Sequence, residues 1–155
     1  MRVLVFSLVV FSCVVVKAGG QEQIKALALS SGFKVSDRIV EAIVEASETF
    51  DIDPLILTVI GILESGLGSN LKTRMNTNGT EDHGIFQINS VNIVKCRAFR
   101  LDTVEGNAFC AAKLLSQIKI RRPSDVAKYH SKTKSKKENY FRKMTQVLRI
   151  ASDKK

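Results

Sequence analysis

The sequence predicts a mainly α-helical protein that folds as one compact domain around a buried central helix. Apolar residues recur at helical spacing over most of the 155-residue chain, and the alternating runs typical of strands are nearly absent. Residues 53–63 are apolar on almost every side of a helix, as expected for a helix at the centre of a core. The Asn78-Gly79 pair favours a tight hairpin turn, so we expect a minimal β-hairpin beside the helices.

Caps and helix breakers place the helices along the chain. A short helix is expected over residues 23–29, and Ser36 or Asp37 can cap a second one. Asp53 as the cap and Pro54 as the first helical residue open the central helix. The remaining helices are expected from a cap at Asn89 or Ser90 towards Cys96, over residues 103–120, from Ser124 or Asp125 to Tyr129 after Pro123, and over residues 138–150.

Residues 1–18 differ in character from the rest of the chain. Arg2 precedes an almost unbroken apolar run over residues 3–16, and Ala18 leaves a small residue where a signal peptidase cuts. The run is shorter than the ~20 residues that span a membrane. We therefore expect a signal peptide over 1–18, a single domain over 19–155, and an exported protein, periplasmic or secreted, with no stable membrane anchor after cleavage. An uncleaved N-terminal anchor is the alternative.

Two cysteines remain once the signal peptide, with Cys13, is removed. In an exported protein such a pair, Cys96 and Cys110, suggests a disulfide, and two buried thiols are the alternative. The two histidines and these cysteines form no cluster with the ligand spacing of a metal site. We therefore expect neither a metal nor a cofactor.

The chain is strongly basic, with a formal net charge of +9. Basic surfaces attract anionic polymers. The cations gather at residues 132–137 and 142–143, without the interleaved aromatic side chains that single-stranded nucleic acid binders use. For an exported protein we expect cell-wall polymer rather than nucleic acid as the partner, and a merely solvated face is the alternative.

Glu64, at the end of the central helix, is the candidate catalytic residue. Ile60 and Leu57 lie four and seven positions earlier, share its helix face and withdraw water from its carboxyl group. That environment favours the neutral acid. Cleavage of a glycosidic bond needs such an acid, because the leaving oxygen must receive a proton as the bond breaks. Glu64 is therefore the candidate general acid.

Several short motifs follow one another in a specific order. They are Glu64-Ser65-Gly66, then residues 78–90 (NGTEDHGIFQINS), then residues 127–131 (AKYHS), then Tyr140. This order resembles the lysozyme-like lytic transglycosylases, and most of all their small exported members that accompany conjugation, type IV and type III secretion, and pilus systems. The resemblance covers about residues 36–150. It implies a lysozyme-like fold, α+β with a minimal β-hairpin, whose core spans that range.

The resemblance also implies roles for individual residues. Glu64 matches the catalytic acid, and Ser65 matches the serine that follows it and can tune the carboxyl group by a hydrogen bond. Gln87 matches the glutamine of the Gly-Leu-Met-Gln motif. Tyr129 matches the tyrosine of the Ala-Tyr-Asn motif, whose hydroxyl in the family lies near the catalytic acid. His130 replaces the asparagine of that motif, as in the Tyr-His-Ser of secretion-linked members. Gln87, Tyr129 and His130 would hold the sugar.

The implied reaction is non-hydrolytic cleavage of peptidoglycan between N-acetylmuramic acid (MurNAc) and N-acetylglucosamine (GlcNAc). Glu64 donates a proton to the bridging oxygen, and then, as a base, takes the proton of the 6-hydroxyl as that oxygen closes a 1,6-anhydro ring. The implied partners are peptidoglycan strands and components of a secretion or conjugation apparatus.

Two other functions stay open at this point. Residues 80–90 also resemble animal-type lysozymes, in which an aspartate at the place of Asp82 is the second catalytic carboxylate, and two acids would permit hydrolysis. Asp82 could equally be a turn residue of the hairpin. A non-catalytic wall-binding scaffold protein is the alternative from another class.

Overall fold

The computed structural model describes residues 20–152 apart from 72–73, 119–122 and 132. The expected signal peptide and Cys13 lie outside the described residues. The described part is mainly helical with one small antiparallel sheet, which confirms the predicted fold class of helices with a minimal hairpin. In that same part of the chain, no helix combines the length and the apolar character needed to cross a membrane.

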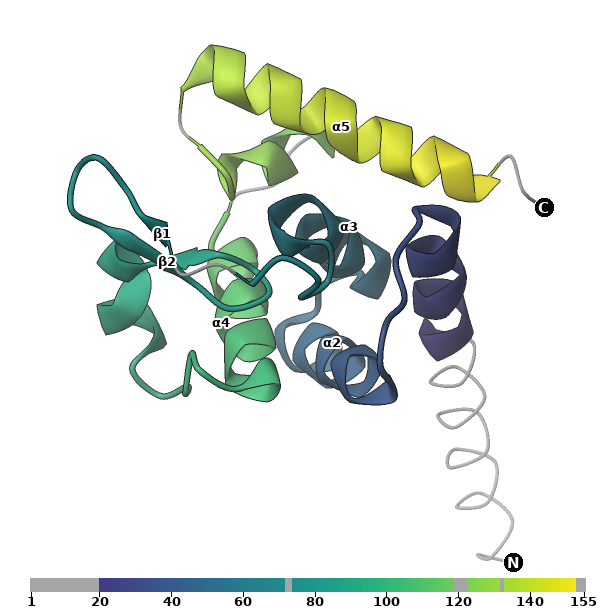
Figure 1. The fold of residues 1–155 in the computed structure, drawn as a ribbon, viewed down its shortest axis with the longest axis horizontal. Helices are drawn as coiled ribbons and strands as arrows, with labels where there is room; N and C mark the ends of the chain where they lie inside the picture. The colour runs from purple at the N-terminus through teal and green to yellow at the C-terminus, as the bar shows by residue number, and fades with distance from the viewer. Residues whose placement is uncertain (1–19, 72–73, 119–122, 132, 153–155) are drawn as a thin grey trace, which may run out of the picture.

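The helices follow the predicted order (Figure 1). They are a helical segment over residues 20–30, α2 (Asp37–Phe50), α3 (Pro54–Ser65), α4 (Val104–Ser116) and α5 (Lys134–Ser152), with two short 3₁₀ helices, η1 (Ser90–Cys96) and η2 (Pro123–Lys128). The predicted caps at Ser36, Asp53 and Asn89 each accept a backbone N–H with their side chains. Local capping chemistry therefore fixes where these helices begin.

Two helix ends differ from the prediction. The helix α4 ends at Ser116 rather than at Ile120. Beyond this point Ile118 N donates to Leu115 O, three residues earlier, over 3.0 Å, which is the tighter bonding of a 3₁₀ turn. The helix α5 begins at Lys134 rather than at Glu138, because Lys137 N already donates to Thr133 O at 3.0 Å. The added first turn of α5 is rich in lysine.

The hairpin predicted at Asn78-Gly79 is present, but its connection is longer than a two-residue turn. Strands β1 (Arg74–Met75) and β2 (Glu81–His83) pair antiparallel, and β3 (Ile88–Asn89) pairs with the other edge of β2. Within the connection Asn76 N donates to Thr80 O, and the Asn78 side chain accepts from Thr80. The side chain of Asn78 thus stabilises a wider loop.

The helix α3 is the predicted central helix. Most of its residues are buried, and Leu57 and Ile60 are fully enclosed. The pair α2 and α4 packs together on one side, whereas α5 lies across α3 and η2 on the other (Figure 1). Gly66 ends α3 by donating its N–H to the carbonyls of the preceding turn. Glu64 therefore lies in the last turn of α3, at the edge of the core.

Cys96 and Cys110 form the predicted disulfide, with Cα atoms 5.4 Å apart. The bond joins the end of η1 to the middle of α4, and both cysteines are buried. It therefore ties the segment that follows the sheet to the helical core.

Replacing both cysteines by alanine is expected to lower the free energy of unfolding by about 3 kcal/mol, the value typical of a closed loop of about 15 residues. The two cysteines are 14 positions apart. Urea unfolding of the variant and of the unchanged protein measures the difference. The unchanged protein in excess reductant should unfold at the variant's midpoint. Equal midpoints for oxidised protein and variant would contradict the prediction.

Candidate active site

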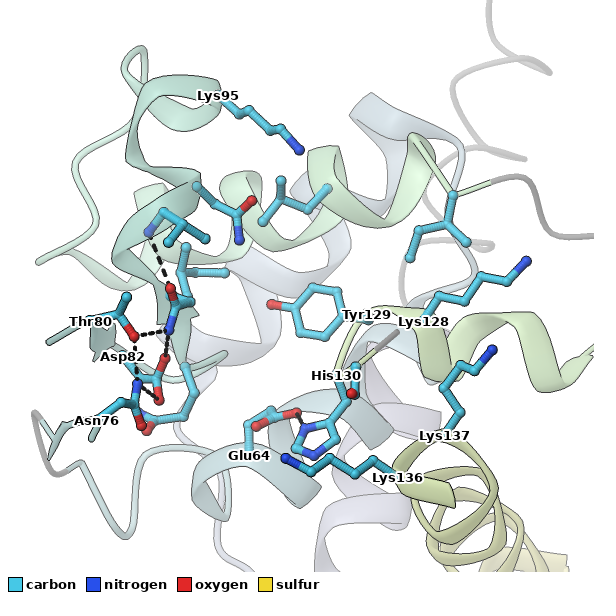
Figure 2. A pocket seen from close by; sticks show the side chains of 18 of the residues that line it. Glu64, Asn76, Thr80, Asp82, Lys95, Lys128, Tyr129, His130, Lys136 and Lys137 are labelled. Atoms are coloured by element: carbon cyan, nitrogen blue, oxygen red, sulfur yellow. Dashed lines mark hydrogen bonds and ion pairs between the residues drawn. The ribbon is translucent and has the colours of Figure 1, made fainter. Parts of the chain in front are cut away.

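A groove of about 1260 Å³ contains most of the predicted site residues. The sheet and η1 form one wall, and η2 with the start of α5 forms the other (Figure 2). The predicted residues that line this groove are Glu64, Asp82, Gln87, Tyr129 and His130. Residues from widely separated parts of the sequence thus meet around one open volume.

Glu64 is largely enclosed but reaches the groove, with 13% of its side chain exposed. Its Oε1 accepts a hydrogen bond of 2.8 Å from the Tyr140 hydroxyl and lies 3.3 Å from His130 Nδ1. Both contacts end on the same oxygen. Among the described residues, none forms a hydrogen bond with Oε2.

Tyr140 is the site residue to which the sequence assigned no role. It lies on the inward face of α5 with Met144 and Val147, four and seven positions later, and only 5% of it is exposed. Burial first, and then the negative charge of Glu64, raise the pKa of the Tyr140 hydroxyl far above its usual value. Tyr140 therefore stays protonated and can only donate to the carboxylate. The helical spacing of the three residues was the available sequence signal.

His130 completes this arrangement. Its ring stacks on the Tyr140 ring, with centroids 4.5 Å apart and planes inclined by 10°. The stack fixes the histidine in the plane from which Nδ1 points at Glu64 (Figure 2). Whether that contact is a hydrogen bond from the histidine depends on its tautomer.

Ser65 does not hold the Glu64 carboxyl group, so this part of the prediction is wrong. Its hydroxyl donates to Ile85 O at 2.6 Å and accepts from Gly68 N at 2.9 Å. A hydroxyl has one proton to donate, and here that proton is used on the backbone. Ser65 is buried and fastens the end of α3 to the loop that follows β2.

Tyr129 lines the groove, but its hydroxyl does not bond the acid. It donates instead to Phe86 O at 3.0 Å. Burial, and after it the charges of Glu64 and Asp82, raise the pKa of Tyr129 well above its usual value. Both carboxylates are therefore within electrostatic reach of this hydroxyl. The expected contact between a tyrosine and the acid is made by Tyr140.

Gln87 sits in a constrained loop. It has a positive φ of 46°, which is uncommon outside glycine, and its Nε2 donates to Gly84 O at 2.8 Å. The loop is held by Asn107 of α4, which accepts from Phe86 N at 2.8 Å and donates to His83 O at 2.9 Å. Asn107 is 1% exposed, and no motif in the sequence marks it as a site residue. This buried amide sets the position of Gln87.

Asp82 points into the same groove from β2 (Figure 2). Its Oδ1 accepts from Asn89 Nδ2 at 2.8 Å and its Oδ2 accepts from Asn76 Nδ2 at 3.1 Å. Both amides also contact the Thr80 hydroxyl. Both oxygens of the Asp82 carboxylate are therefore held by amide donors, whereas the contacts of Glu64 with Tyr140 and His130 both end on Oε1.

The chain matches no family model, no curated protein and no solved structure. Within the described residues, no three histidine, cysteine or acidic side chains gather in a way that could hold a metal ion.

Proposed function

We propose that this protein is a peptidoglycan lytic transglycosylase that cleaves the β-1,4 bond between MurNAc and GlcNAc and leaves 1,6-anhydro-MurNAc ends. The observation that carries the proposal is the Glu64 carboxyl group, whose Oε1 is occupied by Tyr140 and His130 while its Oε2 has no bonding partner among the described residues. A proton on this carboxyl group belongs on Oε2, because Oε1 already accepts from the tyrosine. The order of sequence motifs supports the same reaction.

The proposed reaction uses Glu64 twice. First the Oε2 proton passes to the glycosidic oxygen, and the bond from that oxygen to the anomeric carbon breaks. The acetamido group of the substrate stabilises the positive charge at the anomeric carbon. The Glu64 carboxylate then takes the proton of the 6-hydroxyl as that oxygen bonds to the anomeric carbon. No water is consumed, and Glu64 ends in its starting state.

The product assay tests the proposal directly. Purified protein is incubated with peptidoglycan, and the released muropeptides are identified by mass spectrometry. Products with 1,6-anhydro ends are expected. Products with reducing ends would favour a muramidase, and no products at all would favour the non-catalytic scaffold.

The hydrolytic alternative has its own supporting observation, which is the orientation of Asp82. Two amides hold this second carboxylate in the same groove as Glu64. Such an arrangement could serve hydrolysis, in which two carboxyl groups flank the scissile bond. Replacing Asp82 by Asn decides between the two. If the protein is a transglycosylase, we expect the variant to form anhydro products at a rate within about tenfold of the unchanged protein. If it is a hydrolase, the rate at which reducing ends form should fall about 10²-fold or more.

The Tyr140 hydroxyl is expected to matter more for turnover than that of Tyr129. The Tyr140→Phe variant should lower kcat about tenfold to a hundredfold, because a hydrogen bond to a charged group contributes about 1.5–3 kcal/mol. Tyr129→Phe is the matched control, since it removes a hydroxyl that donates to a backbone carbonyl in the same groove. A larger kcat loss for Tyr129→Phe would contradict the assignment.

We also propose that the activity opens the wall locally for a secretion or conjugation apparatus. The resemblance to small exported transglycosylases supports this role. Deletion of the gene should impair assembly of the apparatus, and the unchanged gene should restore it. A Glu64→Gln gene that restores assembly equally well would favour the scaffold function.

A further inference from the structure

Lysines line the same groove as the carboxylates. Four of them contribute to its walls: Lys95, Lys128, Lys136 and Lys137. In Figure 2, Lys128 and Lys137 project together on the side of His130 away from Asp82, and Lys95 lies at the far rim. In the same view the Lys136 side chain extends toward Glu64 and His130, so the groove carries both carboxylates and ammonium groups.

The fold itself does not account for two of these cations. Lys128 pairs with Asp125 at 2.9 Å, and Lys95 lies in the last turn of η1, where the helix dipole favours a positive charge. Lys136 and Lys137, in contrast, form no ion pair with any residue that the structure describes. Both lie in the first turn of α5, where no acidic residue is present. A cation there is repelled by the positive end of the helix dipole, so local helix energetics disfavour them.

Neutral sugar rings do not account for them either. Sugar hydroxyls and acetamido groups are recognised by neutral donors and acceptors, which the groove has in the side chains of Asn92 and Gln117. Lysines bind anionic groups as point charges. In wall glycan the carboxylates are carried by the lactyl arm on the 3-oxygen of MurNAc, either as the free lactyl carboxylate or on a stem peptide.

We propose that Lys136 and Lys137 bind the carboxylates on the lactyl arm of MurNAc, and so select wall glycan over neutral glycan. This inference rests on the proposed function for the identity of the glycan. It assigns the groove two separate tasks, with bond cleavage at Glu64 and recognition of charge at the start of α5.

A binding assay separates this inference from catalysis. The Glu64→Gln protein serves as the host, so that bound glycan is not cleaved. Affinity is measured by calorimetry for three probes: peptide-bearing glycan strands, strands freed of peptides by an amidase, and neutral chitohexaose. The test variant is Lys136→Gln/Lys137→Gln. The matched control, Arg142→Gln/Lys143→Gln, removes the same charge from exposed positions on the same helix outside the groove.

The test variant is expected to bind carboxylated strands about threefold to thirtyfold more weakly at low salt, with unchanged affinity for chitohexaose. The control should match the host on all three probes. The loss should shrink as salt is raised. A loss on peptide-free strands assigns the lactyl carboxylate, and a loss confined to peptide-bearing strands assigns the stem peptide.

Three outcomes would overturn the inference. They are an equal loss on chitohexaose, no loss on either charged strand, and displacement of the strands by a DNA oligonucleotide at lower concentration than by free strands. None of these depends on product formation. If the active protein yields no anhydro ends but the lysine effect is present, the proposed function fails and the charge recognition stands.

Discussion

A Glu64→Gln variant should form anhydro products at least about 10³-fold more slowly than the unchanged protein. General acid and base catalysis each contribute about 10²- to 10⁴-fold, and in the proposed reaction one carboxyl group supplies both. A glutamine keeps the oxygen that accepts from Tyr140, so the side chain should stay in place. It has no proton acidic enough to donate to the leaving oxygen. Rates of anhydro muropeptide release measure the effect.

The control for this variant is Glu138→Gln. Glu138 is exposed on α5 outside the groove, so the same chemical change should leave the rate within about twofold. Unfolding midpoints of both variants should match the unchanged protein. If the Glu64→Gln protein keeps a tenth or more of the rate, Glu64 is not the general acid and base of the reaction.

Replacing Gly84 by Ala should lower the free energy of unfolding by about 3 kcal/mol and abolish activity with it. Gly84 has a φ of 68°, which costs about 1 kcal/mol or more for alanine, and its new Cβ would collide with the buried Asn107 side chain. Asn107 cannot move away without losing its bonds to Phe86 N and His83 O. The loop that carries Gln87 would therefore be displaced. Urea unfolding and the product assay measure the two effects.

Gly79 supplies the matched control, because its φ of 76° is similar but nothing lies within 4 Å of an added Cβ. Gly79→Ala should cost only the backbone strain, about 1 kcal/mol, and leave product formation nearly unchanged. If the two variants lose the same stability, the collision with Asn107 is not the cause.

The fold could be predicted from the sequence where local chemistry decides it. As predicted, the side chains of Ser36, Asp53 and Asn89 cap their helices by accepting a backbone N–H. The apolar pattern of α3 correctly placed this helix at the centre of the core. The start of α5 was missed, because a lysine-rich turn is a poor helix start by its own energetics. The groove that this turn lines is formed by segments far apart in the sequence, so no local sequence pattern could predict it.

The site could be predicted only in part, because its contacts join distant positions. The bond from Tyr140 to Glu64 spans 76 positions, and no periodicity connects them. Tyr129 and Tyr140 were both visible in the sequence, but which hydroxyl reaches the acid depends on how α5 lies over α3. The buried amide of Asn107 was likewise invisible, since its helix position suggests only an ordinary core residue.

The dependence of Glu64 on the C-terminal helix has a consequence for when the site comes into being during folding. The acid is in place once α3 is formed, but its two contacts come from His130 and Tyr140, near the end of the chain. One wall of the groove is built from the same late segment. A chain that ends after α4 would therefore hold the carboxyl group without its contacts to His130 and Tyr140. Tyr140 can reach Glu64 only after α5 has formed and packed against α3.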